Sequence, residues 1–99
     1  MVINSSTTLC CLLGHPVSHS ISPVIQNASF KELGLNYVYL ALDVKENKLA
    51  KAVGGLRALN AIGFNVTMPH KFVIINLLDG LDPLAERIKA VNTVVNEKG

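Results

Sequence analysis

The chain has 99 residues, 49% of them hydrophobic and 16% charged, so it has the length of one domain and is too apolar to be a disordered tail. Its net charge of +2 comes from basic and acidic residues scattered along the chain, which excludes the basic stripe that nucleic-acid binding needs. No apolar run reaches the roughly 18 residues that cross a bilayer, and the N-terminus lacks the basic region of a signal peptide, so we expect a cytoplasmic protein without a membrane partner.

The first elements expected are a strand and a helix. An apolar run over 8–13 stops at a glycine and is typical of a strand buried on both faces. Ser22 and Pro23 form a cap and first-turn pair, and Gly34 is a helix-ending glycine, so a helix is expected over 23–33. Its inward face should contain Val24, Ile25, Ala28 and Leu33.

Two adjacent cysteines, Cys10 and Cys11, lie in the first expected strand. Neighbouring cysteines make a poor disulfide, which indicates a reducing compartment. With His15 and His19 they offer four zinc-ligand side chains, but a structural zinc site normally contains a separated C-x2-C pair. We therefore interpret the cysteines as small apolar strand residues and expect no metal site.

The middle of the chain predicts two more strands with helical segments between them. Alternating apolar residues over 37–44 are typical of a strand. The segment 46–61 favours helix but is interrupted at Gly54 and Gly55, so two short helices are expected, with Leu49, Ala52, Val53, Leu56, Leu59 and Ile62 facing the sheet. A third short strand follows at 64–67.

The last third contains one ambiguous segment, 71–78, whose β-branched residues favour strand while its flanking proline and glycine suit a helix equally well. A short helix over 82–89 and a strand over 90–95 should follow. Strands alternating with helices predict the α/β class, as a three-layer α/β/α sandwich with a mostly parallel sheet, in one domain over 1–99.

Polar residues that follow strands are the candidates for a binding site, because ligands of open α/β sheets bind at the carboxyl ends of the strands. Ser20 and Ser22 place two hydroxyl groups at a helix N-terminus, where free N–H groups and the helix dipole favour a carboxylate or phosphate. Alternatively, Ser22 only caps the helix and Ser20 only satisfies a turn.

Two later segments carry further candidates. Lys71 follows the third strand, and in the first turn of a helix its ammonium would have a lowered pKa and could act as an acid or base; a solvated lysine is the alternative. Asn92 lies among apolar residues and needs a partner, either a ligand hydroxyl or a neighbouring loop. The chain contains no G-x-G-x-x-G motif and no Walker A loop, so no dinucleotide site is visible.

Three segments resemble the shikimate dehydrogenase family, in its N-terminal substrate-binding domain. They are 14–23 with Asn27 following, 63–71 and 90–95, in the order and spacing of the family, and together they cover nearly the whole chain. The resemblance implies that the ambiguous segment 71–78 is a helix.

The resemblance also implies site roles. Ser20 and Ser22 would bind the carboxylate of shikimate or 3-dehydroshikimate, and Thr67, Lys71 and Asn92 would line the pocket around the ring hydroxyls, supported by Asn65. Lys71 would act with an aspartate as the acid–base pair while hydride passes reversibly between NADPH and the C3 carbonyl of dehydroshikimate, a step of aromatic amino-acid biosynthesis.

The chain departs from the family pattern in several ways. The acid–base aspartate and the NADP-binding Rossmann domain would lie beyond Gly99, so NADP(H) is expected in the complete enzyme, and this chain alone is expected to bind no cofactor and to be inactive. Gln26 stands where the family commonly has histidine, and Lys89 where it usually has glycine. Missing segments should leave apolar surface exposed and favour self-association.

Two alternative functions remain open. The chain is either a stand-alone or truncated non-catalytic module that binds a shikimate-like hydroxy-acid, or a fragment whose three motifs only pack.

Overall fold

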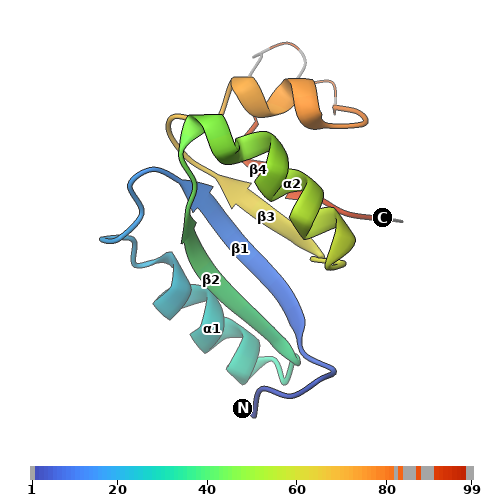
Figure 1. The fold of residues 1–99 in the computed structure, drawn as a ribbon. Helices are drawn as coiled ribbons and strands as arrows, with labels where there is room; N and C mark the ends of the chain where they lie inside the picture. The colour runs from blue at the N-terminus through green and yellow to red at the C-terminus, as the bar shows by residue number, and fades with distance from the viewer. Residues whose placement is uncertain (1, 82, 84–86, 88–90, 98–99) are drawn as a thin grey trace.

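A four-stranded sheet forms the centre of the fold in a computed structural model, which describes residues 2–81, 83, 87 and 91–97 (Figure 1). The strands are β1 (Thr8–Gly14), β2 (Tyr37–Asp43), β3 (Gly63–Val66) and β4 (Thr93–Val95), in the order β2-β1-β3-β4. β1 pairs in parallel with both β2 and β3, whereas β4 runs antiparallel to β3. The prediction of a mostly parallel sheet is therefore confirmed.

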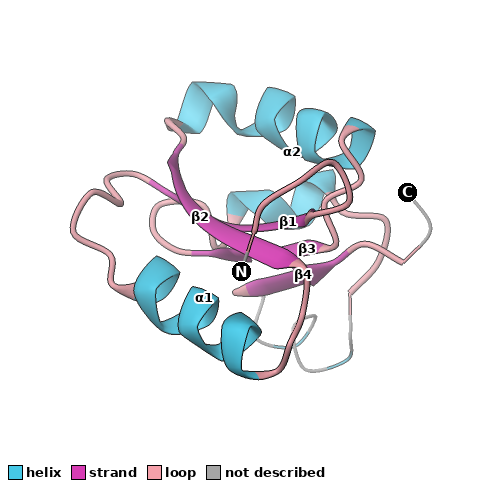
Figure 2. Cartoon of the chain, turned by 90° about the horizontal axis from the view of Figure 1, so that it is seen from below, coloured by secondary structure: helices cyan, strands magenta, loops and turns pink. Residues whose placement is uncertain are grey.

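The two α-helices lie on opposite faces of this sheet, which gives the three layers (Figure 2). α1 (Ser22–Glu32) follows β1, and α2 (Leu49–Ala58) follows β2 after a short 3₁₀ turn, η1 (Glu46–Lys48). α1 and α2 are the crossovers between parallel strands, so each covers one face of the sheet. After each helix the chain re-enters the sheet at the end where the parallel strands begin. The predicted α/β/α sandwich is confirmed.

Successive side chains of β1 point to opposite faces of the sheet, and they belong to two separate clusters of the core. Cys11 and Leu13 face α2 and pack in a cluster with its buried residues, whereas Cys10 and Leu12 lie in the cluster on the α1 side. The neighbouring thiols therefore point to opposite faces of the sheet. Burial raises the pKa of Cys10, and burial followed by the neighbouring Cys10 raises the pKa of Cys11 to about 11, so both thiols stay protonated at neutral pH.

The expected inward face of α1 is wrong. Val24 is 74% exposed and Leu33 71% exposed, and α1 has no fully buried residue. Phe30 is the apolar side chain of α1 that packs against the core of the sheet. The reason is how the helix is rotated about its axis. Asn27 hydrogen-bonds the edge strand β2, so the face of α1 that contains Asn27 turns toward the sheet and the face with Val24 and Ile25 turns outward.

The expected break between two helices at Gly54 and Gly55 is also wrong, because α2 continues through both glycines. Its buried residues Leu49, Val53 and Leu56 form one stripe at helical spacing, and their burial stabilises the helix beyond the cost of the glycines. Leu59, expected inside, is 71% exposed after the end of the helix.

The segment after β3 is helical, as the resemblance implies, but only as the five-residue 3₁₀ helix η2 (Val73–Leu77). Ile74 anchors it, with no exposed surface. The helix expected over 82–89 falls mostly outside the described residues, as do Lys89 and Ala90. The final strand begins at Thr93, later than the expected 90.

Candidate functional site

A cavity of about 400 Å³ opens on the α1 side of the sheet, at the carboxyl end of β1. It is lined by Leu12, the loop residues 16–20, Ser22 and Thr67. Its walls come from the end of β1, the β1–α1 loop and the first turn of α1, joined by Thr67 from the distant segment after β3. Its size suits a small organic molecule, and its hydroxyl groups suit polar recognition.

Ser20 and Ser22 both line this cavity, but their roles at the helix differ from the expectation. Ile21 is the N-cap residue and Ser22 is the first helical residue, so the prediction that Ser22 caps the helix is wrong. The backbone N–H of Ser22 donates to Ser20 Oγ at 3.2 Å. Neither serine donates its hydroxyl hydrogen to a described residue, so both hydroxyl groups can donate to a ligand.

The free N–H groups expected at the start of α1 are not present. The amides of Val24 and Ile25 donate to the carbonyl of Ile21, and Pro23 has no N–H. An anion in this cavity would therefore be bound mainly by the two serine hydroxyls, assisted by the positive end of the helix dipole.

Thr67 is held against the β1–α1 loop. Its backbone N–H donates to the carbonyl of Leu13 at 2.9 Å, and the N–H of His15 donates to the carbonyl of Met68 at 3.2 Å. These bonds continue the β1–β3 pairing beyond the strand ends. They bring the segment after β3 into the same cavity as the two serines.

Lys71 lies in the turn before η2, not in the first turn of a helix, so the argument from a helix dipole does not apply to it. Its half-buried side chain makes no hydrogen bond or ion pair with any described residue. Its backbone carbonyl accepts from the N–H of Val91 at 2.9 Å, which places Lys71 next to the segment that contains Asn92. Lys71 is not among the residues that line the cavity.

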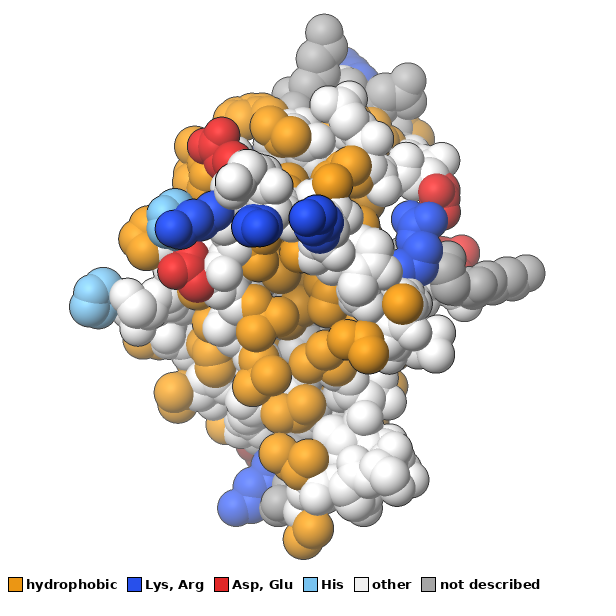
Figure 3. Space-filling model, in the orientation of Figure 1, with side chains coloured by type: hydrophobic (Ala, Val, Ile, Leu, Met, Phe, Trp, Pro, Cys, Tyr) orange, Lys and Arg blue, Asp and Glu red, His pale blue; other side chains and the backbone are white. Residues whose placement is uncertain are grey.

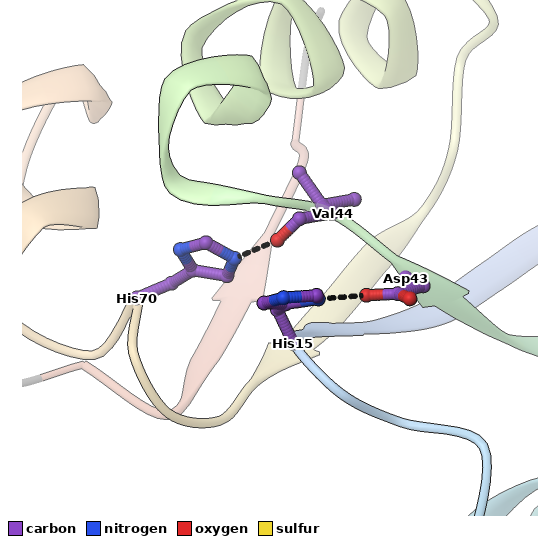
Figure 4. Close-up of polar contacts among 4 residues, drawn as sticks. All are labelled: His15, Asp43, Val44 and His70. Atoms are coloured by element: carbon purple, nitrogen blue, oxygen red, sulfur yellow. Dashed lines mark hydrogen bonds and ion pairs between the residues drawn. The ribbon is translucent and has the colours of Figure 1, made fainter.

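Two histidines connect the loops of the site to the end of β2 (Figure 4). His70 is fully buried and its Nε2 bonds the carbonyl of Val44 at 2.5 Å, which anchors the residue before Lys71. Because a carbonyl only accepts, Nε2 carries the hydrogen, and Nδ1 has no partner among the described residues. His15 Nδ1 lies 2.6 Å from Asp43 Oδ1 in an exposed pair.

Asn92 precedes β4 and is exposed, so the expectation of an amide inside an apolar strand is wrong. Its carbonyl accepts from the N–H of Val66 at 2.9 Å and from Asn65 Nδ2 at 3.4 Å. Asn65 Nδ2 also donates to Thr93 Oγ1 at 3.1 Å. Asn65 therefore joins β3 to the start of β4, beside the cavity.

Sequence reasoning missed two residues that support these asparagines. Tyr39 donates its hydroxyl hydrogen to Asn65 Oδ1 at 2.8 Å, and Asn27 bonds both backbone groups of Tyr39. Asn27 was quoted with the first motif but received no role. Tyr39 lies in the strand predicted over 37–44, and a buried tyrosine needs a partner for its hydroxyl, which is the signal that could have pointed to it.

The described residues show neither a free glycine-rich loop after a strand nor a cluster of metal ligands. The amides at the start of α1 already have partners, and Gly54 and Gly55 lie inside α2 and not after a strand, so no glycine-rich loop is free to hold a pyrophosphate. Within the described ranges no three His, Cys, Asp or Glu side chains lie close enough to hold a metal. None of the helices described is long and apolar enough to cross a membrane.

The fold and the cavity define an α/β domain with a cavity of small-molecule size at the carboxyl end of a mostly parallel sheet. The family described as "Shikimate dehydrogenase substrate binding domain" matches residues 12–94. The chain therefore belongs to the shikimate dehydrogenase family, which confirms the resemblance.

Individual shikimate dehydrogenases are similar to this chain in sequence and in structure. The shikimate dehydrogenase (NADP(+)) of Moorella thermoacetica is 58% identical over 95 residues, which are 96% of this chain and 32% of that protein. A crystal structure of shikimate dehydrogenase in complex with NADP+ superposes with a TM-score of 0.96 at 50% identity, covering 99% of this chain and 34% of the other. Shikimate 5-dehydrogenase from Listeria monocytogenes, in complex with shikimate and NAD, gives a TM-score of 0.94 at 48% identity, over 96% and 33% of the two chains. The chain thus spans about a third of the length of these relatives.

Proposed function

We propose that this chain binds shikimate and 3-dehydroshikimate as the substrate-binding domain of an NADP-dependent shikimate dehydrogenase. The observation that carries the proposal is the cavity that brings Ser20 and Ser22 together with Thr67, which is distant in sequence. A carboxylate accepts hydrogen bonds, and the two serine hydroxyls are available donors beside a helix N-terminus.

The remaining roles are assigned from the resemblance to the family, because Thr67 lines the cavity whereas Lys71 and the two asparagines do not. Thr67, Lys71 and Asn92 would contact the ring hydroxyls, and Asn65 would hold Asn92 in place through its own hydrogen bonds. Lys71 has no partner among the described residues, so its ammonium is available to exchange a proton with the substrate oxygen.

The cofactor would act outside this chain. NADP(H) would supply the hydride when it is bound in the complete enzyme. This chain would position the substrate and hold a proton at Lys71 Nζ. We therefore expect no NADPH oxidation with 3-dehydroshikimate from these 99 residues alone, and activity of this chain would contradict that division of roles.

Titration of the ¹⁵N-labelled chain with shikimate tests the proposal. We expect saturable amide shifts centred on segments 16–22 and 65–71. Ser20→Ala should raise Kd about 10-fold, because it removes one hydrogen bond to a charged group, and Lys71→Ala should raise it by a similar factor. Ser29→Ala is the matched control, since Ser29 is an exposed serine of α1 outside the cavity.

Absence of saturable shifts would overturn the proposal and favour a fragment whose motifs only pack. Saturable binding is common to the dehydrogenase and to the alternative of a stand-alone binding module. The intact mass of the native polypeptide, detected with an antibody to this domain, separates them: a mass well above 10.6 kDa supports the two-domain enzyme, and 10.6 kDa supports the module.

Two coarser proposals accompany this function. We place the protein in the cytoplasm, where an enzyme of small-molecule biosynthesis finds its substrate, with no nucleic-acid or membrane partner. We also propose that the chain self-associates through its exposed apolar surface.

A further inference from the structure

We propose that Tyr39 is a positioning residue for the candidate site: its phenol orients the Asn65 amide, and through it the start of β4 where Asn92 lies. The ligand part of this inference rests on the proposed function, whereas the orientation of Asn65 stands on geometry alone.

The tyrosine reaches Asn65 across a strand. In the sheet register Tyr39 lies opposite Cys10, and Asn65 lies opposite Leu12, so β1 separates the two residues. All of these side chains belong to the α1 side of the sheet, on which the cavity opens. Tyr39 is 4% exposed and its hydroxyl oxygen lies 2.8 Å from Asn65 Oδ1. This hydrogen bond therefore lies next to Leu12, which lines the cavity.

Bonds at its two ends determine which way the Asn65 amide faces. Nδ2 donates to Thr93 Oγ1 at 3.1 Å and to the carbonyl of Asn92 at 3.4 Å. A flipped amide would place Oδ1 against the Asn92 carbonyl, and two acceptors repel. Burial, followed by the neighbouring thiols of Cys11 and Cys10, raises the pKa of the Tyr39 hydroxyl, so it remains a donor at neutral pH.

The backbone of Tyr39 is also held in place, by hydrogen bonds at the outer edge of β2. Asn27 Oδ1 accepts from the Tyr39 N–H at 2.8 Å, and Asn27 Nδ2 donates to the Tyr39 carbonyl at 2.9 Å. The amide thus takes the place of a neighbouring strand at the open edge of β2. Because Asn27 and Ser22 belong to the same helix, one tyrosine connects the helix of the serines to the asparagines of β3 and β4.

Two matched variants of the ¹⁵N-labelled chain test this inference. Tyr39→Phe removes the hydroxyl and keeps the ring. Tyr37→Phe is the control, because Tyr37 lies on the same face of β2 and its ring meets that of Phe30 edge to face, with 5.4 Å between the ring centroids. The Tyr37 hydroxyl bonds no described residue. We expect the side-chain NH₂ signals of Asn65 to shift in Tyr39→Phe and to stay in place in Tyr37→Phe.

The shikimate titration supplies the second readout. Tyr39→Phe should raise Kd by about 3- to 10-fold, the effect of one lost hydrogen bond, and Tyr37→Phe should leave it within about twofold. Thr93→Val removes the acceptor at the other end of Asn65 from an exposed position, so it should shift the same NH₂ signals even if Tyr39→Phe folds poorly.

The outcomes separate this inference from the proposed function. Unchanged Asn65 signals in Tyr39→Phe, or an equal rise of Kd in both tyrosine variants, would overturn the positioning role. If the unaltered chain does not bind shikimate, the proposed function fails, and the Asn65 signals then decide alone whether Tyr39 orients that amide.

Discussion

Gly14, at the end of β1, shows how closely the site loops approach one another. A Cβ atom at this position would lie 2.2 Å from Thr67 Cγ2 and 2.9 Å from Val17 Cγ1. Both neighbours are β-branched side chains of the cavity wall, with few rotamers into which they could move. Glycine is therefore required here by space.

Gly14→Ala should lower the free energy of unfolding by about 1–3 kcal/mol and weaken shikimate binding, because the added methyl displaces Thr67. Urea unfolding and the shikimate titration measure the two effects. Thr67→Ser in the same chain keeps the hydroxyl and removes Cγ2, so it should restore part of both losses. Gly80→Ala is the control, since no atom lies within 4 Å of its Cβ position. A Gly14→Ala chain as stable as the unaltered one would refute this account.

At the scale of elements, α2 contains two glycines that the packing of the helix does not require. Gly54 and Gly55 lie in its interior, and a Cβ on either would meet no atom within 4 Å. The helix forms because Leu49, Val53 and Leu56 bury one stripe against the sheet. The glycines therefore add flexibility to the unfolded chain without a packing role in the folded one.

Gly54→Ala and Gly55→Ala should each raise the free energy of unfolding by about 0.5–1 kcal/mol, measured by urea denaturation. Gly63→Ala in β3 provides the contrast, because its Cβ would lie 2.5 Å from the carbonyl oxygen of Val94 and must destabilise the sheet. Destabilisation by the α2 substitutions would mean that the glycines have a role in the native helix.

At the scale of the whole molecule, the chain exposes more surface than a compact protein of its mass. Its accessible area is 6741 Å², against about 5,500 Å² expected for a 10.6 kDa monomer. Apolar side chains form a band over β1 and β2 beside α2 (Figure 3). Leu40, a residue of β2, is 45% exposed. The outer face of α1 adds Val24 and Ile25, which are 74% and 54% exposed.

This surface predicts self-association of the 99-residue chain with a second copy of itself. Sedimentation velocity should show a mass that rises with concentration, and Leu40→Lys should shift the distribution toward monomer, because a charge at the contact must be desolvated. Val2→Lys is the matched control at an already exposed, peripheral valine. A single 10.6 kDa species at every concentration would contradict the prediction.

Much of the architecture was determined by the sequence alone. Hydrophobic periodicity and glycine or proline positions were enough to place β1, α1, β2 and β3 near their observed bounds, because these signals are local. The three motifs identified the family, which the match over residues 12–94 confirms. The roles assigned to Ser20, Ser22, Thr67 and Lys71 remain predictions.

The tertiary structure decided what local patterns do not contain. The inward face of α1 depends on the bond of Asn27 to a strand ten or more residues away, and the continuity of α2 depends on burial against the sheet. The placement of Lys71 before η2, and of Tyr39 against Asn65, likewise depends on contacts between distant segments. The inward face of a helix and the hydrogen-bond partner of a side chain depend on the packed molecule. Both are determined by which apolar surfaces and polar groups come into contact when the helices pack on the sheet.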